Sequence, residues 1–173
     1  HMRAPKGEAR VRLTELESLR GGVIALSGDE EGPVRRALAR NDMPAAEAAL
    51  RELCHVFGND HVAVEVQRHR HRGEALTNRQ LVDLARARGV PLVATGGALY
   101  HDSARRPLHD AFTALRHHTT LDQAGLLLSP NGQRALRTPP QMAALFADVP
   151  EAVENTARVA ERLEFSLGAL GYE

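Results

Sequence analysis

The chain has 173 residues, 43% of them hydrophobic, which is enough for one domain with a core of its own. Its 22 basic and 22 acidic residues cancel, which excludes a global electrostatic attraction to nucleic acid or to anionic lipid. The single cysteine excludes an internal disulfide, and no apolar run approaches the roughly 20 residues of a membrane helix, so we expect a cytoplasmic protein.

The first third of the chain is predicted to form a lead-in, one strand and two helices. His1-Met2 is typical of an expression tag, and residues 1–20 are too polar for a core element. The continuous apolar run at 23–27 predicts a buried strand. Proline suits the first turn of a helix and Gly58 a helix end, so helices are expected at 33–40 and 41–58. Cys54 lies in an apolar stripe of the second helix, where packing is its expected role.

The middle of the chain reads as a strand, a helix and a strand. The strands are expected at 62–67 and 91–95 because both segments are short and apolar. Thr77 and Gln80 have the spacing of a capping box, which predicts that the helix between the strands starts there. Parallel strands present their carboxyl ends to ligands in α/β proteins. The residues that follow these two strands, 68–71 and 96–99, are therefore the first candidates for a functional site.

The last third is predicted to be helical. A helix from Ser103 is expected to turn Leu108, Phe112 and Leu115 inward, and a second capping box joins Thr138 to Gln141. The final helix is expected from Glu151 to about Leu163. Three strand candidates are too few for a closed barrel, which commonly needs about eight, so the chain looks like part of a larger sheet.

Several motifs follow one another along the chain in a definite order. They are Gly22-Val-Ile-Ala-Leu-Ser-Gly28, Val64-Glu-Val-Gln-Arg-His69, Gly89-Val-Pro-Leu-Val-Ala-Thr95, Leu108-His-Asp-Ala-Phe112, Asn131-Gly-Gln133, Leu136-Arg-Thr-Pro-Pro-Gln-Met142 and Pro150-Glu-Ala-Val-Glu-Asn155. In this order they resemble the later part of the PHP (polymerase and histidinol phosphatase) domain of bacterial C-family (DnaE-type) DNA polymerase alpha subunits. The ending at 165–172, with Phe-Ser-Leu and then Leu-Gly-Tyr, is more similar to the error-prone branch than to the replicative one.

The resemblance implies an α/β fold: a partial, distorted (β/α)7 PHP barrel with three parallel strands, followed by C-terminal helices. In domain terms, residues 1–20 would be tag remnant and lead-in, 21–137 the later part of the PHP domain, and 138–173 a helical exit toward the polymerase palm. In members with an intact site, histidines and carboxylates at the strand ends bind metal ions that activate water for phosphoester hydrolysis.

Only one metal ligand carries over to this sequence. His69 matches the histidine that follows the middle strand of the family. Metal-binding members read Asn-Asp-x-His-Tyr after the next strand, but here Gly97 and Leu99 stand at the aspartate and histidine positions. One histidine cannot hold a hydrolytic metal cluster, so the resemblance implies a degraded site with no catalytic and no cofactor-binding residue.

Other histidines have alternative readings. His101 and Asp102 could substitute for the missing ligands, although a loop that enters a helix, with Asp102 or Ser103 as its N-cap, accounts for them too. His69 and His71 could equally be a solvated pair at a strand end. His117 and His118 are expected at a helix C-terminus, because neighbouring helical side chains point about 100° apart and do not easily chelate one ion.

The resemblance implies that this is a fragment of an error-prone (translesion) DNA-directed DNA polymerase, a nucleotidyltransferase, and that the fragment is a structural PHP module without catalysis of its own. DNA, deoxynucleoside triphosphates and magnesium are then expected for the parent enzyme, and residual zinc or manganese for His69. Two alternatives stay open: an active metal-dependent phosphoesterase or 3′→5′ exonuclease using His69, His101 and Asp102, and a non-catalytic module that docks replication or repair proteins through exposed apolar surface. Such a surface also predicts self-association of the isolated fragment.

Overall fold

The computed structural model describes residue 5, residues 11–164, and residues 166, 168 and 171. The tag interpretation at His1-Met2 and most of the 165–172 motif lie outside these residues. None of the helices in the described part of the chain is long and apolar enough to cross a membrane.

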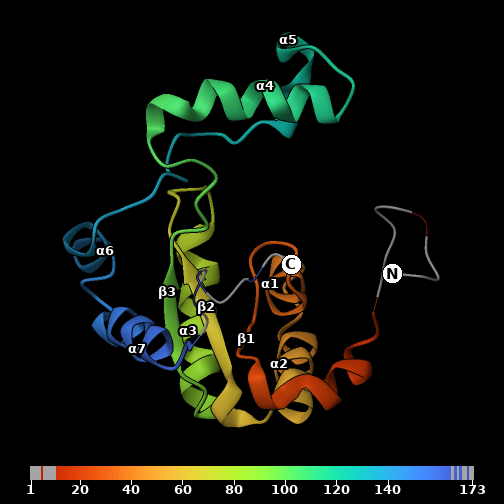
Figure 1. The fold of residues 1–173 in the computed structure, drawn as a ribbon, viewed down its shortest axis with the longest axis vertical. Helices are drawn as coiled ribbons and strands as arrows, with labels where there is room; N and C mark the ends of the chain where they lie inside the picture. Colours follow the sequence, from red (N-terminus) through yellow and green to blue (C-terminus); the bar gives the residue numbers. More distant parts are fainter. Residues whose placement is uncertain (1–4, 6–10, 165, 167, 169–170, 172–173) are drawn as a thin grey trace. The chain divides into compact units, whose positions relative to one another are not determined.

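Short strands alternate with helices along the first two thirds of the chain, and helices follow (Figure 1). Contacts divide the chain into two compact units, residues 1–65 with 79–91, and residues 66–78 with 92–173. The elements are η1 (Leu13–Gly22), β1 (Ala25–Leu26), α1 (Pro33–Ala39), α2 (Met43–Phe57), η2 (Asn59–His61), β2 (Val62–Gln67), α3 (Glu74–Arg88), β3 (Leu92–Thr95), η3 (Ser103–Arg105), α4 (Arg106–Arg116), α5 (Leu121–Ala124), η4 (Gly125–Leu127), α6 (Pro139–Leu145) and α7 (Pro150–Glu161).

The strands form one sheet in the order β1-β2-β3, which agrees with the three strands expected. β1 pairs in parallel with β2, and Ala25 lies opposite Val62. The sequence predicted a strand over 23–27, but the strand covers only Ala25 and Leu26, and Ser27 adds one backbone hydrogen bond to Ala63. Val23 and Leu26 are exposed, so this first strand is a short, half-solvated edge and not a buried one.

The first unit is built on α2. Asp42 caps this helix by accepting the backbone N–H of Ala45 at 3.0 Å, and Gly58 ends it with a φ of 85° that favours glycine. Leu50 and Phe57 on one face of α2 are buried in the core. Burial also raises the pKa of the Cys54 thiol, as expected of a packing residue rather than a nucleophile.

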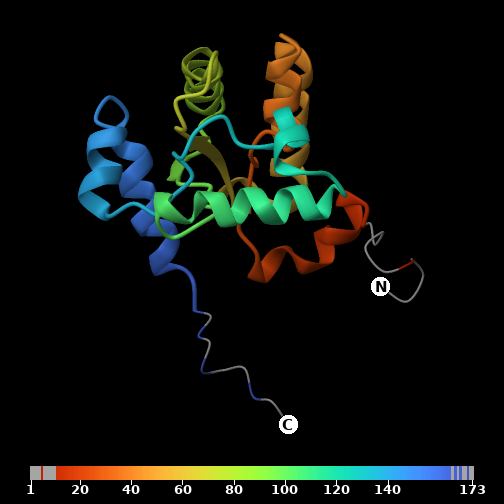
Figure 2. The same ribbon diagram turned by 90° about the horizontal axis from the view of Figure 1, so that it is seen from above.

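In the second unit, α7 packs against β3, and the two elements lie side by side in Figures 1 and 2. Two polar side chains of α7 bind backbone carbonyls of the strand. The Asn155 amide donates to the carbonyl of Leu92 and the Thr156 hydroxyl to that of Ala94, both at 2.9 Å. These hydrogen bonds satisfy buried acceptors of β3 and fix the position of the strand, which leads directly into Gly96 and Gly97.

The expected start of α3 at Thr77 is wrong, because the helix begins at Glu74 and Thr77 lies inside it. Gly73, with a φ of 79°, makes the turn before the helix. The Glu74 carboxylate then accepts backbone N–H groups of the preceding loop. That buried interaction outweighs the local capping preference of Thr77. The capping box from Thr138 to Gln141 is confirmed, with the Thr138 N–H 2.8 Å from the Gln141 side-chain oxygen.

The predicted inward face of α4 is also wrong. Leu108, Phe112 and Leu115 are 52%, 62% and 68% exposed, and Ala114 is the buried residue of this helix among the described ones. The periodicity marks an apolar face correctly, but nothing in the described chain covers it. This exposed apolar face of α4 is a surface through which the isolated chain could self-associate. Self-association itself stays a prediction.

Candidate functional site

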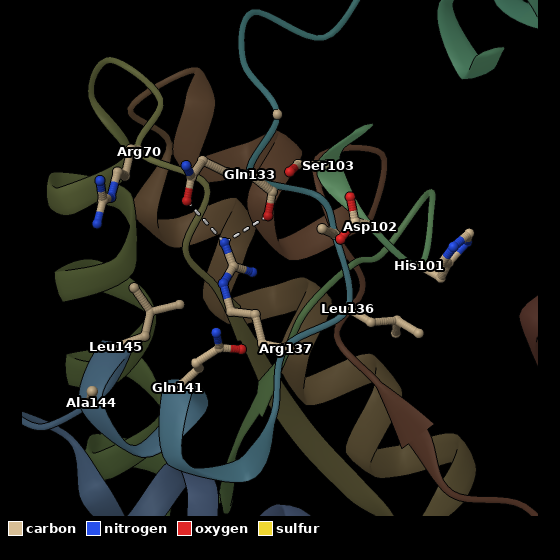
Figure 3. A pocket seen from close by; sticks show the side chains of 12 residues that line it. Arg70, His101, Asp102, Ser103, Gln133, Leu136, Arg137, Gln141, Ala144 and Leu145 are labelled. Carbon is tan, nitrogen blue, oxygen red and sulfur yellow. Dashed lines mark hydrogen bonds between the residues drawn. The ribbon is translucent and has the colours of Figure 1, made fainter. Parts of the chain in front are cut away.

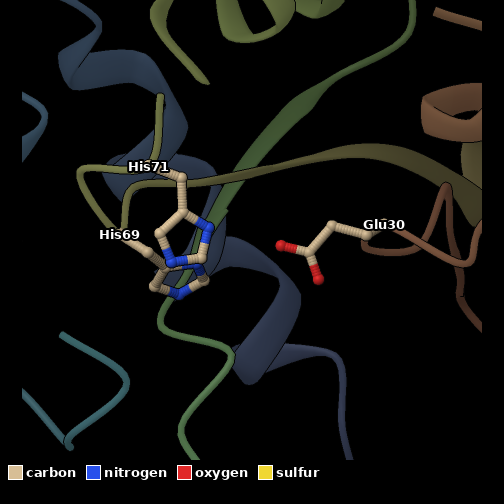
Figure 4. Close-up of side chains that lie close together, drawn as sticks. All are labelled: Glu30, His69 and His71. Atoms are coloured by element: carbon tan, nitrogen blue, oxygen red, sulfur yellow. The ribbon is translucent and has the colours of Figure 1, made fainter. Parts of the chain in front are cut away.

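His69 follows β2 directly and is completely buried, with 0% exposure. Figure 4 shows its ring close to that of His71, and the ring centroids lie 5.5 Å apart with 44° between the planes. The reading of these residues as a solvated pair is therefore wrong for His69. A buried polar ring at the carboxyl end of a strand needs hydrogen-bond partners, and these decide what it can do.

One ring nitrogen of His69 is engaged by the backbone and the other is not. Nε2 lies 2.9 Å from the carbonyl oxygen of Gly96, which can only accept, so Nε2 carries the proton. Nδ1 is buried and makes no hydrogen bond with the described residues, although Glu74 Oε1 lies 3.8 Å away. His69 therefore offers one lone pair, at Nδ1, as the metal ligand that the sequence predicts.

The charge state of His69 is set by its surroundings. Burial lowers the pKa of the imidazole, the hydrogen bond to Gly96 opposes this, and the positive charge of Arg134 lowers the pKa further. Glu74 raises the pKa and His71 lowers it, but both effects are smaller. The net shift is downward, so the folded chain holds His69 in its neutral form near neutral pH.

This lowered pKa predicts acid sensitivity. Unfolding frees His69 to take up a proton at its ordinary pKa of about 6.5, so the unfolded chain binds more protons than the folded one below that pH. We expect the free energy of unfolding to fall as pH drops from about 6.5 through the lowered pKa of His69. Urea unfolding at several pH values measures this, and a His69→Gln variant should lose that part of the pH dependence. Parallel pH profiles for the two proteins would contradict it.

Glu74 shapes the loop that carries the histidines. Its Oε1 accepts the backbone N–H of His69 at 2.7 Å, and its Oε2 accepts that of Arg70 at 2.8 Å. The Asn131 amide closes the loop from the other side by donating to the carbonyl of His69 at 2.7 Å. Arg70 adopts a φ of 58°, which a residue with a side chain rarely takes, and these bonds hold it there.

The second strand end, at Gly96–Leu99, is crowded by side chains from other segments of the second unit. A Cβ atom at Gly97 would lie 2.7 Å from the Gln67 side-chain oxygen and 3.1 Å from Nη2 of Arg134. Arg134 also donates from Nε to the carbonyl of Gly97 at 2.8 Å. Position 97 thus has neither a carboxylate nor room for one, and a guanidinium lies beside it.

The other candidates, His101, Asp102, His117 and His118, lie in the loop before η3 or at the end of α4. Asp102 accepts the backbone N–H of Ala104 at 2.7 Å and caps η3, as the helix-entry interpretation predicts. His101 beside it is exposed. His117 caps the C-terminus of α4, and His118 follows with a φ of 52°. Asp102, His117 and His118 therefore lie at helix ends, as the structural interpretation of these residues predicts.

Sequence reasoning missed two residues at this site, Glu74 and Arg134. Glu74 lies five residues after His69, and its acidic position in the first turn of α3 was a usable signal once the helix start was placed correctly. Arg134 lies 37 residues from Gly97, in a segment without regular secondary structure. No local pattern predicts such a contact, so only the fold reveals it.

Comparisons with known proteins agree with the resemblance. Residues 1–69 match the PHP domain family. An error-prone DNA polymerase of Mycobacterium tuberculosis is 38% identical over 163 residues, which cover 94% of this chain and 15% of the relative. Error-prone DNA polymerases of Bradyrhizobium diazoefficiens and Brucella abortus are 44% and 50% identical over 104 and 84 residues, or 60% and 49% of this chain and 9% and 8% of each relative. The chain thus spans less than a sixth of the length of these relatives.

Proposed function

We propose that this chain is a segment of an error-prone DNA polymerase in which the PHP stretch has a structural role. The chain is similar to such polymerases, and its own residues 1–69 match the PHP domain family. In this proposal the segment holds no hydrolytic metal centre. DNA and deoxynucleoside triphosphates are substrates of the parent enzyme, and magnesium is its cofactor. Nucleotidyl transfer takes place in other parts of that polymerase.

The contact between Arg134 and Gly97 carries the proposal. A guanidinium at a strand end places a fixed positive charge where metal-binding members of the family have a carboxylate. It lowers the pKa of His69, which means that its field reaches the imidazole, and the same field disfavours a divalent cation there. The Nδ1 lone pair of His69 does not offset that repulsion by itself, because hydrolytic metal sites use three or more protein ligands.

The hydrogen bonds of the two loops support a structural role. The backbone of His69 is held by Glu74 and Asn131, and its ring by Gly96. His69 therefore links the end of β2 to the end of β3. An imidazole that joins two strand ends by a hydrogen bond stabilises the fold, and this role does not require a bound metal ion.

A metal titration tests the proposal. We expect Zn²⁺ and Mn²⁺ to bind the purified chain weakly in calorimetry, with the same heats for the wild type and for His69→Ala, because the Nδ1 atom of His69 is buried close to the positive charge of Arg134. Circular dichroism checks that the variant is folded. Tight binding that disappears in His69→Ala would sink the proposal. Chelator-sensitive hydrolysis of a chromogenic phosphodiester would then favour the phosphoesterase alternative.

A further inference from the structure

A pocket of about 580 Å³ lies in the second unit, beside α6. Neither His69 nor His71 lines it, although Arg70 from the same loop does, together with His101 and Asp102. Its walls come from the loop after β2, the loop after β3, the segment 132–137 and α6 (Figure 3). Its volume falls in the range of about 300–1,000 Å³ that is typical of small-molecule sites.

Two arginines in this pocket lack a carboxylate partner. Figure 3 shows Arg137 in the middle of the lining side chains, and its Nη2 donates to the backbone and side-chain oxygens of Gln133 at 2.6 and 3.1 Å. These bonds fix the guanidinium, while Nη1 has no acceptor within the described residues. Arg70 is exposed, and its side chain forms no hydrogen bond or ion pair with the described residues. A buried donor without an acceptor is costly, and a ligand oxygen would remove that cost.

The neutral side chains of the pocket also present donors. The oxygen of the Gln133 amide accepts from Arg137, and the oxygen of the Gln141 amide accepts the backbone N–H of Thr138. Both amides therefore have their NH₂ groups left for a ligand. The one lining carboxylate, Asp102, is engaged as the cap of Ala104. The pocket is consequently rich in donors and cations and poor in acceptors.

We propose that this pocket binds the phosphate group of a nucleotide or polynucleotide, with Arg137 as the fixed contact and the exposed Arg70 as a second contact. A tetrahedral oxyanion matches the planar fork of an arginine, and it accepts from several donors at once. The chemistry is the same for a free nucleotide and for a nucleic acid backbone. This inference goes beyond the proposed function and does not depend on the state of the His69 site.

The test is a binding titration of the chain in phosphate-free buffer with three probes: inorganic pyrophosphate, thymidine monophosphate and a short single-stranded oligothymidylate. We expect binding that weakens with added salt and drops about tenfold or more in Arg137→Gln, which keeps a polar side chain with an NH₂ donor but loses the charge and the guanidinium fork. Arg70→Gln should also weaken binding, and its exposed position keeps the test valid if Arg137→Gln does not fold. Arg116→Gln, an exposed arginine of α4 outside the pocket, is the control and should bind as the wild type does.

The three probes separate the two sources of phosphate. Binding of thymidine monophosphate but not of the oligonucleotide supports the pocket as a nucleotide site, and the reverse supports a backbone site. Binding of pyrophosphate that depends on Arg137 supports the shared chemistry. Failure of all three probes to bind, or binding that is unchanged in both Arg137→Gln and Arg70→Gln, overturns the proposal.

Discussion

Replacing Glu74 by alanine is expected to lower the free energy of unfolding by about 3–4 kcal/mol, because two charge-assisted hydrogen bonds are lost at a buried site. The carboxylate is only 9% exposed, and its two oxygens accept the backbone N–H groups of His69 and Arg70. Without it, one buried N–H loses its acceptor and Arg70 loses the contact that holds its backbone at a φ of 58°.

Urea unfolding followed by circular dichroism measures this effect. Glu52→Ala, an exposed glutamate in the middle of α2, is the matched control and should change stability by less than about 0.5 kcal/mol. Amide hydrogen exchange adds a local readout, since protection at His69 and Arg70 should fall in Glu74→Ala. Equal stabilities of the Glu74 and Glu52 variants would refute the view that the Glu74 carboxylate stabilises this loop.

Replacing Gly97 by alanine is expected to destabilise the fold by about 2–4 kcal/mol. Part of this cost, about 1–2 kcal/mol, comes from placing a side chain at a φ of 49°. The rest comes from the close approach of the new Cβ to the Gln67 side chain and to Arg134. Gln67 is only 3% exposed, so it cannot swing into solvent to make room.

A second glycine provides the control for the backbone part of the cost. Gly89 has a φ of 64°, but a Cβ there meets nothing within 4 Å. Gly89→Ala should therefore carry only the conformational cost, and the difference between the two variants isolates the crowding at position 97. Equal losses of stability would mean that position 97 has room for a side chain, which would reopen the question of a metal ligand there.

The helices and strands follow largely from local patterns in the chain. The stops at Gly58 and Gly89, the proline at the start of α1 and the capping box at Thr138 agree with the structure because each depends on residues within one or two helical turns. The wrong predictions concern features that depend on residues far apart in the sequence. α3 starts at Glu74 because its carboxylate binds the preceding loop, and the apolar face of α4 is exposed because the described chain places nothing over it.

The sequence by itself determined the relationship to error-prone polymerases, the three strands, and the absence of a carboxylate and an imidazole at positions 97 and 99, because these are properties of residue identity and order. Only the tertiary structure decided that His69 is buried and tied to Gly96, and that Arg134 lies beside Gly97. The physical reason is range: a hydrogen bond or a buried charge joins residues 27 to 37 positions apart, and no local periodicity encodes such a pairing.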